Sequence, residues 1–161
     1  QPGAYDERAI ETRQDVLIFT TPPLEKDLFA AGPVEAVLFV TSSAPDTDFT
    51  VKLVDVYPDG RAFNVQDGIL RLRYRNGPQA AEPLEPGEVY EITVSLNATA
   101  NVFQVGHRIR LEVSSSNFPA YDRNLNTGGD TANGTIWQSA ENRVLHGPET
   151  PSRLILTVID E

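Results

Sequence analysis

Apolar residues recur along this chain mostly at alternate positions, in short runs separated by turn-forming residues. The run of β-forming residues from Val34 to Val40 is long enough to cross a core and indicates a buried strand. Residues 49–54 alternate instead, which predicts a strand with one buried face. Between these runs, residues 41–48 predict a polar corner, and Pro58-Asp59-Gly60 predicts a tight turn after the second strand.

The same criteria predict further strands along the rest of the chain. They cover residues 15–21, 61–66, 69–75, 90–96, 102–105, 109–113 and 153–159, with weaker signals at 136–137 and 144–145. The first should lie at a sheet edge, because Pro22-Pro23 directly after it cannot continue a hydrogen-bonded ladder. Residues 24–31 fit either a helical turn or a short strand. Gly32-Pro33 should interrupt the chain after them, and Asp67-Gly68 predicts another turn.

These elements together predict the fold class. About eight to ten strands, frequent turn signals and no helix longer than two turns are typical of an all-β sandwich or barrel, and the long loops favour a jelly roll. The 161 residues fit a single domain, with residues 1–13 as a polar, linker-like lead-in. Residues 114–135 form the longest irregular stretch, and a loop of this size is usually functional or packed on a neighbour.

Composition and charge narrow the choice of partners. The chain has 13 basic and 23 acidic side chains and a formal charge of −10, which argues against nucleic-acid binding because phosphates require a basic surface. No apolar run approaches the roughly 20 residues that cross a bilayer, and no signal-peptide pattern opens the chain, so we expect no membrane partner. Cysteine is absent, which fits a soluble cytoplasmic or an exported protein equally well.

The residues that could perform catalysis are sparse. A serine hydrolase on an α/β scaffold needs Gly-x-Ser-x-Gly, and the chain contains no such motif. Ser114-Ser115-Ser116 follows a predicted strand but lacks flanking glycines. His107 should be a strand-start residue with a structural hydrogen bond, and His146 should be a turn residue. We therefore predict no catalytic residue in this chain.

Metal binding has only weak candidates. Two distant histidines make a zinc site improbable, because zinc requires three or four converging ligands. Asp46 and Asp48, or Asp122 and Asp130, could give oxygen ligands to calcium, but turn formation is the simpler interpretation. We therefore predict no cofactor and no metal.

Carbohydrate chemistry is an alternative to an accessory role. Glycoside hydrolysis requires two carboxylates, and the 23 acidic residues single out no pair. Binding is the better alternative, since lectin-like sandwiches combine exposed aromatic residues with polar loops, and Phe118, Tyr121 and Trp137 flank the long loop. A place for these aromatic residues in a core or at a domain interface is favoured over sugar binding. The row Arg71, Arg73 and Arg75 indicates a solvated or salt-bridged sheet face rather than an anion site.

Short motifs spread over nearly the whole chain carry a family resemblance. They are Thr21–Leu24, Gly32–Val34, Ser42–Phe49, Lys52–Gly60, Asp67–Arg71, Leu84–Gly87, Gly106–Arg110, Ser115–Pro119, Asp122–Asn124 and Pro151–Leu154. Jointly and in this order they resemble the C-terminal, non-catalytic domain of the X-prolyl dipeptidyl-peptidase and cocaine esterase hydrolase family. Thr157 departs from this pattern, because the family often has proline there.

This resemblance implies both a fold and a partner. The implied fold is a galactose-binding-like jelly-roll β-sandwich. The implied parent is an α/β-hydrolase that cleaves esters, amides or X-Pro dipeptides and carries its Ser-Asp-His triad in a preceding domain. This chain would then be a fragment of the larger hydrolase, would pack on the catalytic domain and would wall one side of its cleft. Formation of a homo-oligomer stays open.

Two parts of the chain are candidates for the cleft or the domain interface. The first is the polar corner with Asp46, Asp48 and Phe49, which projects between two core strands; a self-satisfied turn is the alternative. The second is the stretch 117–133, whose Asn side chains would cap backbone groups across the contact. Its candidate residues are Asn117, Phe118, Tyr121 and Asn124.

Overall fold

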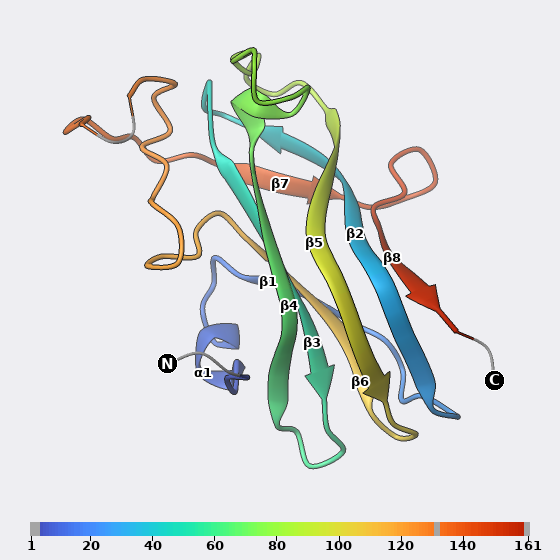
Figure 1. Cartoon of the computed structure of the whole chain (residues 1–161). Coiled ribbons are helices and arrows are strands. Elements are labelled where there is room, and N and C mark those ends of the chain that lie inside the picture. Colours follow the sequence, from blue (N-terminus) through green and yellow to red (C-terminus); the bar gives the residue numbers. More distant parts are fainter. Residues whose placement is uncertain (1–3, 131–132, 160–161) are drawn as a thin grey trace.

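The computed structural model describes residues 4–130 and 133–159, which form two antiparallel sheets packed face to face (Figure 1). Sheet A contains, in spatial order, β1 (Leu17–Thr20), β6 (Arg108–Ser114), β3 (Asp48–Val56) and β4 (Ala62–Arg71). Sheet B contains β5 (Tyr90–Phe103), β2 (Leu28–Ser42) and, both along the other edge of β2, β7 (Asn142–Leu145) and β8 (Arg153–Val158). The helices of the described residues are short: α1 (Arg8–Glu11) and a 3₁₀ helix at Leu72–Tyr74. The prediction of an all-β, jelly-roll sandwich is confirmed.

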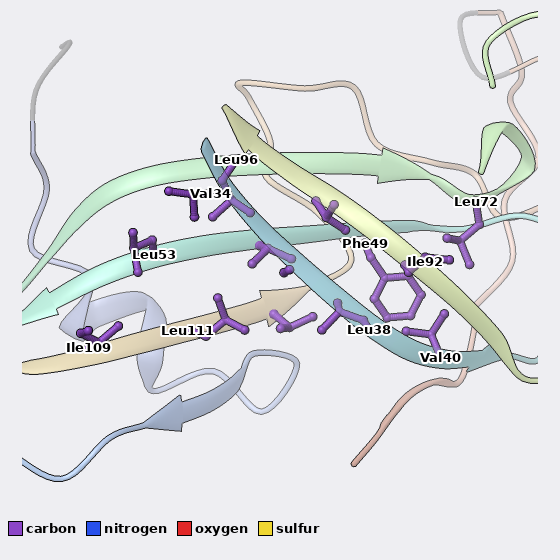
Figure 2. Close-up of a cluster of buried hydrophobic side chains, with 14 of the residues drawn as sticks. Val34, Leu38, Val40, Phe49, Leu53, Leu72, Ile92, Leu96, Ile109 and Leu111 are labelled. Atoms are coloured by element: carbon purple, nitrogen blue, oxygen red, sulfur yellow. The ribbon is translucent and has the colours of Figure 1, made fainter. Parts of the chain in front are cut away.

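Inward-facing side chains of the two sheets form one hydrophobic core (Figure 2). The apolar run from Val34 to Val40 lies in β2, and its inward side chains are buried, as predicted. Phe49 and Leu53 of β3, in the facing sheet, join the same cluster. Each fully buried side chain of this kind contributes about 1.5–3 kcal/mol, so this core holds the two sheets together.

Strand β3 is buried on both faces, which differs from the half-buried strand that its alternation predicts. On its outer face, Lys52 contacts Glu7 of the lead-in and Asp48 contacts Asn124 of the long loop. The lead-in also contacts the neighbouring strand β4. The backbone N–H of Glu7 donates to the carbonyl of Ala62 at 2.8 Å, and Asp6 forms a bridge with Phe63. Val54, Val56 and Ala62 form a second, small buried cluster. The lead-in is therefore part of the sandwich in its described portion.

A group of charged side chains fixes the lead-in to sheet A. Glu7 is buried and accepts from Lys52 Nζ at 2.9 Å through both carboxylate oxygens, and Glu11 is paired with Arg110. Glu112 lies beside Lys52 in the sheet register, and its buried Oε1 has no hydrogen-bond partner among the described residues. Burial raises the pKa of Glu112 to about 8, with further contributions from a hydrogen bond with Glu11 and the negative charge of Glu7. The folded domain therefore favours the protonated form of this carboxyl.

The predicted turn at Asp67-Gly68 is wrong, because both residues lie inside β4. Gly68 pairs with Val51, and a Cβ atom at Gly68 would lie 2.1 Å from the backbone oxygen of Ser95 in sheet B. The glycine thus permits close approach of the two sheets rather than a turn. The strand ends at Arg71, earlier than predicted, and continues into the 3₁₀ helix.

The predicted interruption at Gly32-Pro33 is also wrong. Residues 24–31, which fit either a helical turn or a strand, join β2 from Leu28 onward. The pairing with β5 shifts register between Pro33 and Glu35, so a β-bulge accommodates the proline without ending the strand.

The remaining predicted elements are partly confirmed. Strand β1 lies at the edge of sheet A as expected, and the tight turn follows β3, with the Tyr57 N–H donating to the Arg61 carbonyl. The predicted separate strand at 102–105 is the end of β5. Of the two weak signals, Val144-Leu145 belongs to β7, whereas Ile136-Trp137 lies outside the strands.

Candidate domain-interface site

The polar corner, residues 41–48, joins the end of β2 in sheet B to the start of β3 in sheet A. Its two carboxylates point into the domain. Asp46 is 0% exposed and Asp48 is 1% exposed. Asp48 accepts two hydrogen bonds from the Arg71 guanidinium, from Nε at 2.9 Å and from Nη2 at 3.0 Å, and this contact raises the pKa of Arg71. Asp46 accepts from the backbone N–H of Arg73 at 3.1 Å and lies 3.4 Å from Arg73 Nε.

Asn124 joins this corner to the long loop. Its Nδ2 donates to Asp46 Oδ2 at 3.0 Å and to Asp48 Oδ1 at 2.7 Å. Arg73 Nη1 reinforces the link by donating to the carbonyls of Gly128 and Gly129 at 3.0 and 2.8 Å. The structure therefore brings together three candidate residues, Asp46, Asp48 and Asn124, in one buried network that anchors the loop.

The arginine row is salt-bridged, as its pattern indicates. Arg71 pairs with Asp48, Arg73 with Asp46, and Arg75 with Glu82. Only Arg71 belongs to β4, because the strand ends there.

Phe49, the third candidate of the corner, belongs to the hydrophobic core and is 2% exposed (Figure 2). It also lines a polar hollow of about 640 Å³ between the long loop and the segment before β1. Phe118 and Asn124 line the same hollow, together with Asn142. Asn142 Nδ2 donates to Thr47 Oγ1 and Ser115 Oγ at 2.9 and 2.8 Å, and its buried Oδ1 has no partner among the described residues.

The remaining candidates lie on the loop surface. Asn117 Nδ2 donates to Asp67 Oδ2 at 2.7 Å, which ties the start of the loop to β4. Phe118 and Tyr121 are exposed, and the Arg123 guanidinium lies 4.6 Å from the Phe118 ring. Trp137, further along, is 70% exposed. The loop aromatics therefore lie outside the core of this domain.

A second, apolar hollow of about 280 Å³ lies between the two sheets at the side of β1. Its lining comes from both sheets and is mainly Phe19, Leu38, Ile109, Leu111, Val144 and Leu154, with His146 at the rim. The Phe19 and His146 rings meet edge to face at 5.7 Å. The hydrophobic pattern of β1 is that of an ordinary edge strand, so the sequence alone does not reveal this hollow between the sheets.

The two histidines lie in different environments. His107 directly precedes β6, and its Nδ1 lies 2.8 Å from Asp55 Oδ1, beside the Tyr57 ring, which confirms the predicted structural hydrogen bond. His146 follows β7 and opens the turn that Pro151 closes. Within residues 4–130 and 133–159, no group of three or more His, Cys, Asp or Glu side chains is arranged to hold a metal ion. None of the described helices is long and apolar enough to cross a membrane.

Fold and surface together define a jelly-roll β-sandwich with apolar side chains left uncovered. The chain belongs to the X-Pro dipeptidyl-peptidase C-terminal non-catalytic domain family, whose pattern matches residues 1–155. Cocaine esterase of Rhodococcus sp. (strain MB1 Bresler) is 51% identical to it over 159 residues, which are 98% of this chain and 28% of the esterase. The family resemblance of the sequence motifs is thus confirmed.

Solved structures agree with this assignment. An α-amino acid ester hydrolase superposes with a TM-score of 0.93 at 35% identity, over 97% of this chain and 27% of that chain. An aminopeptidase from a marine sediment Thaumarchaeota archaeon superposes with a TM-score of 0.92, also at 35% identity, over 96% and 27%. The chain therefore spans little more than a quarter of the length of these relatives.

Proposed function

We propose that this chain is an accessory, non-catalytic domain of a larger α/β-hydrolase that cleaves esters, amides or X-Pro dipeptides. In this proposal it packs on the catalytic domain and shapes the active-site cleft. The observation that carries it is the match to cocaine esterase, which includes 98% of this chain at 51% identity but only 28% of the enzyme. The rest of such a parent has room for a catalytic domain.

The long loop is the surface that we assign to the cleft or domain interface. Exposed apolar side chains on this loop and directly after it are Phe118, Tyr121, Ile136 and Trp137. Exposed apolar groups gathered on one segment suit contact with a partner better than contact with water. Asp46, Asp48 and Asn124 serve this surface indirectly, because their buried network holds the loop in place. Phe49 supports it from the core side of the polar hollow.

Side-by-side hydrolysis assays test this function. The substrates are p-nitrophenyl acyl esters and the p-nitroanilides of Gly-Pro and Ala-Pro, given to this chain and to a longer parent that contains it. Activity is expected in the parent alone. Activity of this chain by itself, abolished by a serine-directed fluorophosphonate, would overturn the proposal.

A carbohydrate-binding module is the second candidate function. The polar hollow of about 640 Å³ beside exposed Phe118 favours it, since sugars bind through polar groups and aromatic faces together. Binding of this chain to defined glycans on an array, lost in Phe118→Ala, would favour this candidate. Absence of glycan binding at millimolar sugar would leave the accessory role.

A further inference from the structure

The sandwich is closed along one side and open along the other. On the closed side β4 lies against β5: Gln66 Nε2 donates to the Ala98 carbonyl at 2.8 Å, and Gly68 contacts the Ser95 backbone. On the open side, β1 of sheet A faces β7 and β8 of sheet B across the apolar hollow.

Side chains that point inward on the open side are nevertheless exposed. Leu17 and Phe19 pair with Val113 and Leu111, and directly opposite residues of an antiparallel pair share a face. Val113 and Leu111 belong to the core, so Leu17 and Phe19 point the same way, yet they are 41% and 36% exposed. Inward-facing apolar residues at the end of a layer need a cover to remove them from water.

The facing sheet shows the same pattern. Val158 of β8 pairs with Ala30, a core residue, and is 45% exposed. Leu154, which pairs with the buried Ala36, lines the hollow. Inward-facing apolar side chains of both sheets are thus exposed along this one side.

The outer edge of β1 has no strand partner among the described residues. The Thr21 N–H donates to the Ile109 carbonyl at 3.0 Å, so Thr21 and the alternate residues before it direct their polar groups toward β6. By the same alternation, the N–H groups of Ile18 and Thr20 point to the outer edge. In sheet A the described residues pair β1 with β6 alone. Such an edge accepts another strand.

We propose that an extended, apolar segment from the hydrolase part of the same polypeptide completes this open side. The segment pairs with the outer edge of β1 and inserts apolar side chains into the hollow between Phe19 and Leu154. This inference rests on the proposed accessory role. A parent as long as the relatives would contain enough chain for such a segment, because this chain covers 28% or less of the esterase, the ester hydrolase and the aminopeptidase.

A second copy of this chain is a poorer occupant. Two β1 strands paired edge to edge would join the two A sheets into one, and neither strand would insert side chains into the other copy's hollow. Two chains of formal charge −10 also repel each other.

Hydrogen–deuterium exchange of the parent protein tests the inference. The amides of Ile18 and Thr20 should exchange at least about tenfold more slowly in the parent than in this chain alone, because pairing protects them. Rapid exchange of both amides in the parent would overturn the inference and leave the accessory role to the hydrolysis assay. Protection in this chain alone, together with a dimeric mass, would assign the edge to a second copy instead.

Two matched variants of the parent locate the contact. Phe19→Asp places a charge in the hollow and should restore rapid exchange at Ile18. Phe29→Asp is the control, because Phe29 is also 36% exposed but neighbours inward-facing Ala30 and so points outward from sheet B. Equal effects of the two variants on Ile18 exchange would contradict the inference. If Phe19→Asp does not fold, the exchange of the unmodified parent decides.

Discussion

At the residue scale, the most deeply buried carboxylates of the domain are paired with positively charged side chains. Asp46, Asp48 and Glu7 each lie almost fully inside the domain, and each contacts a cation. A buried charge without a partner costs several kcal/mol, so each partner is essential to the local structure. Glu112 avoids the cost of a buried charge differently, because its raised pKa favours the uncharged, protonated carboxyl.

Asp48→Ala should destabilise the domain by about 3 kcal/mol, at the lower end for a broken buried pair because Arg71 keeps some access to water. Urea unfolding followed by far-ultraviolet circular dichroism measures the change. The control Asp59→Ala removes an exposed partner of Arg61 and should leave the free energy of unfolding nearly unchanged. Equal losses in the two variants would contradict the assignment of Asp48 to a buried pair.

Glu112 should make stability fall as pH rises through its titration range. The unfolded chain releases this proton near the ordinary glutamate pKa of 4.5, whereas the folded chain keeps it up to a pKa of about 8. Between these values the folded state binds more protons, so the free energy of unfolding decreases with increasing pH. Glu112→Gln removes this dependence and should gain stability relative to the native chain from pH 5 to pH 9. Parallel stability curves for the two proteins, measured by urea unfolding, would exclude this role. Glu141→Gln, an exposed site, serves as the control.

At the element scale, strand identity follows from the pattern of residues, but strand continuity depends on tertiary contacts. Alternation located β5 and β6, and runs of β-forming residues located β2 and β8. The predictions at Gly32-Pro33 and Asp67-Gly68 were wrong, because glycine and proline are not confined to turns. Pro33 lies at a β-bulge, and Gly68 permits a close contact between the two sheets. Those uses depend on neighbours that are distant in sequence.

The sequence likewise predicts the segments that form the candidate site but not the contacts between them. The corner and the long loop were recognisable from turn-forming residues, and motif order gave the family. The bonds of Asn124 to Asp46 and Asp48 join residues at least 76 positions apart, so no local pattern reveals them. The outward position of Trp137 likewise depends on how the loop folds back.

Gly68→Ala should destabilise the sandwich by about 2–3 kcal/mol or more, because the new Cβ would press on the backbone of Ser95. Gly129→Ala is the control: its Cβ would meet only Thr127 Oγ1 at an ordinary 3.5 Å. Thermal unfolding of both variants compares them. A Gly68→Ala protein as stable as the control would show that the sheets do not approach closely here.

Asn124→Ala should loosen the long loop without unfolding the sandwich. Loss of one donor shared by two buried carboxylates costs about 1–3 kcal/mol, and this loss falls on the loop anchor. Limited proteolysis should cut within residues 125–140 faster than in the native chain. Asn76→Ala, which removes a hydrogen bond to Glu82 in another loop, should leave that rate unchanged. Unaltered cleavage in Asn124→Ala would mean that other contacts hold the loop.

At the scale of the whole molecule, the domain has two unlike sides. The β4–β5 side is closed by backbone contact, whereas the β1 side and the neighbouring long loop leave apolar groups in water. The proposed place of this domain in a larger hydrolase would account for this asymmetry. The same explanation accounts for a chain that matches its relatives along nearly its whole length and spans little more than a quarter of theirs.

Removal of these 161 residues from a longer parent tests that central claim most directly. The measurement is kcat/KM for the ester that the parent cleaves best, in the parent, in the shortened protein, and in the shortened protein mixed with this chain. We expect the shortened protein to lose most of its activity and to regain part of it in the mixture. A shortened protein with the parent's full kcat/KM and thermal stability would contradict the account, because the domain would then neither hold the catalytic domain nor shape its cleft.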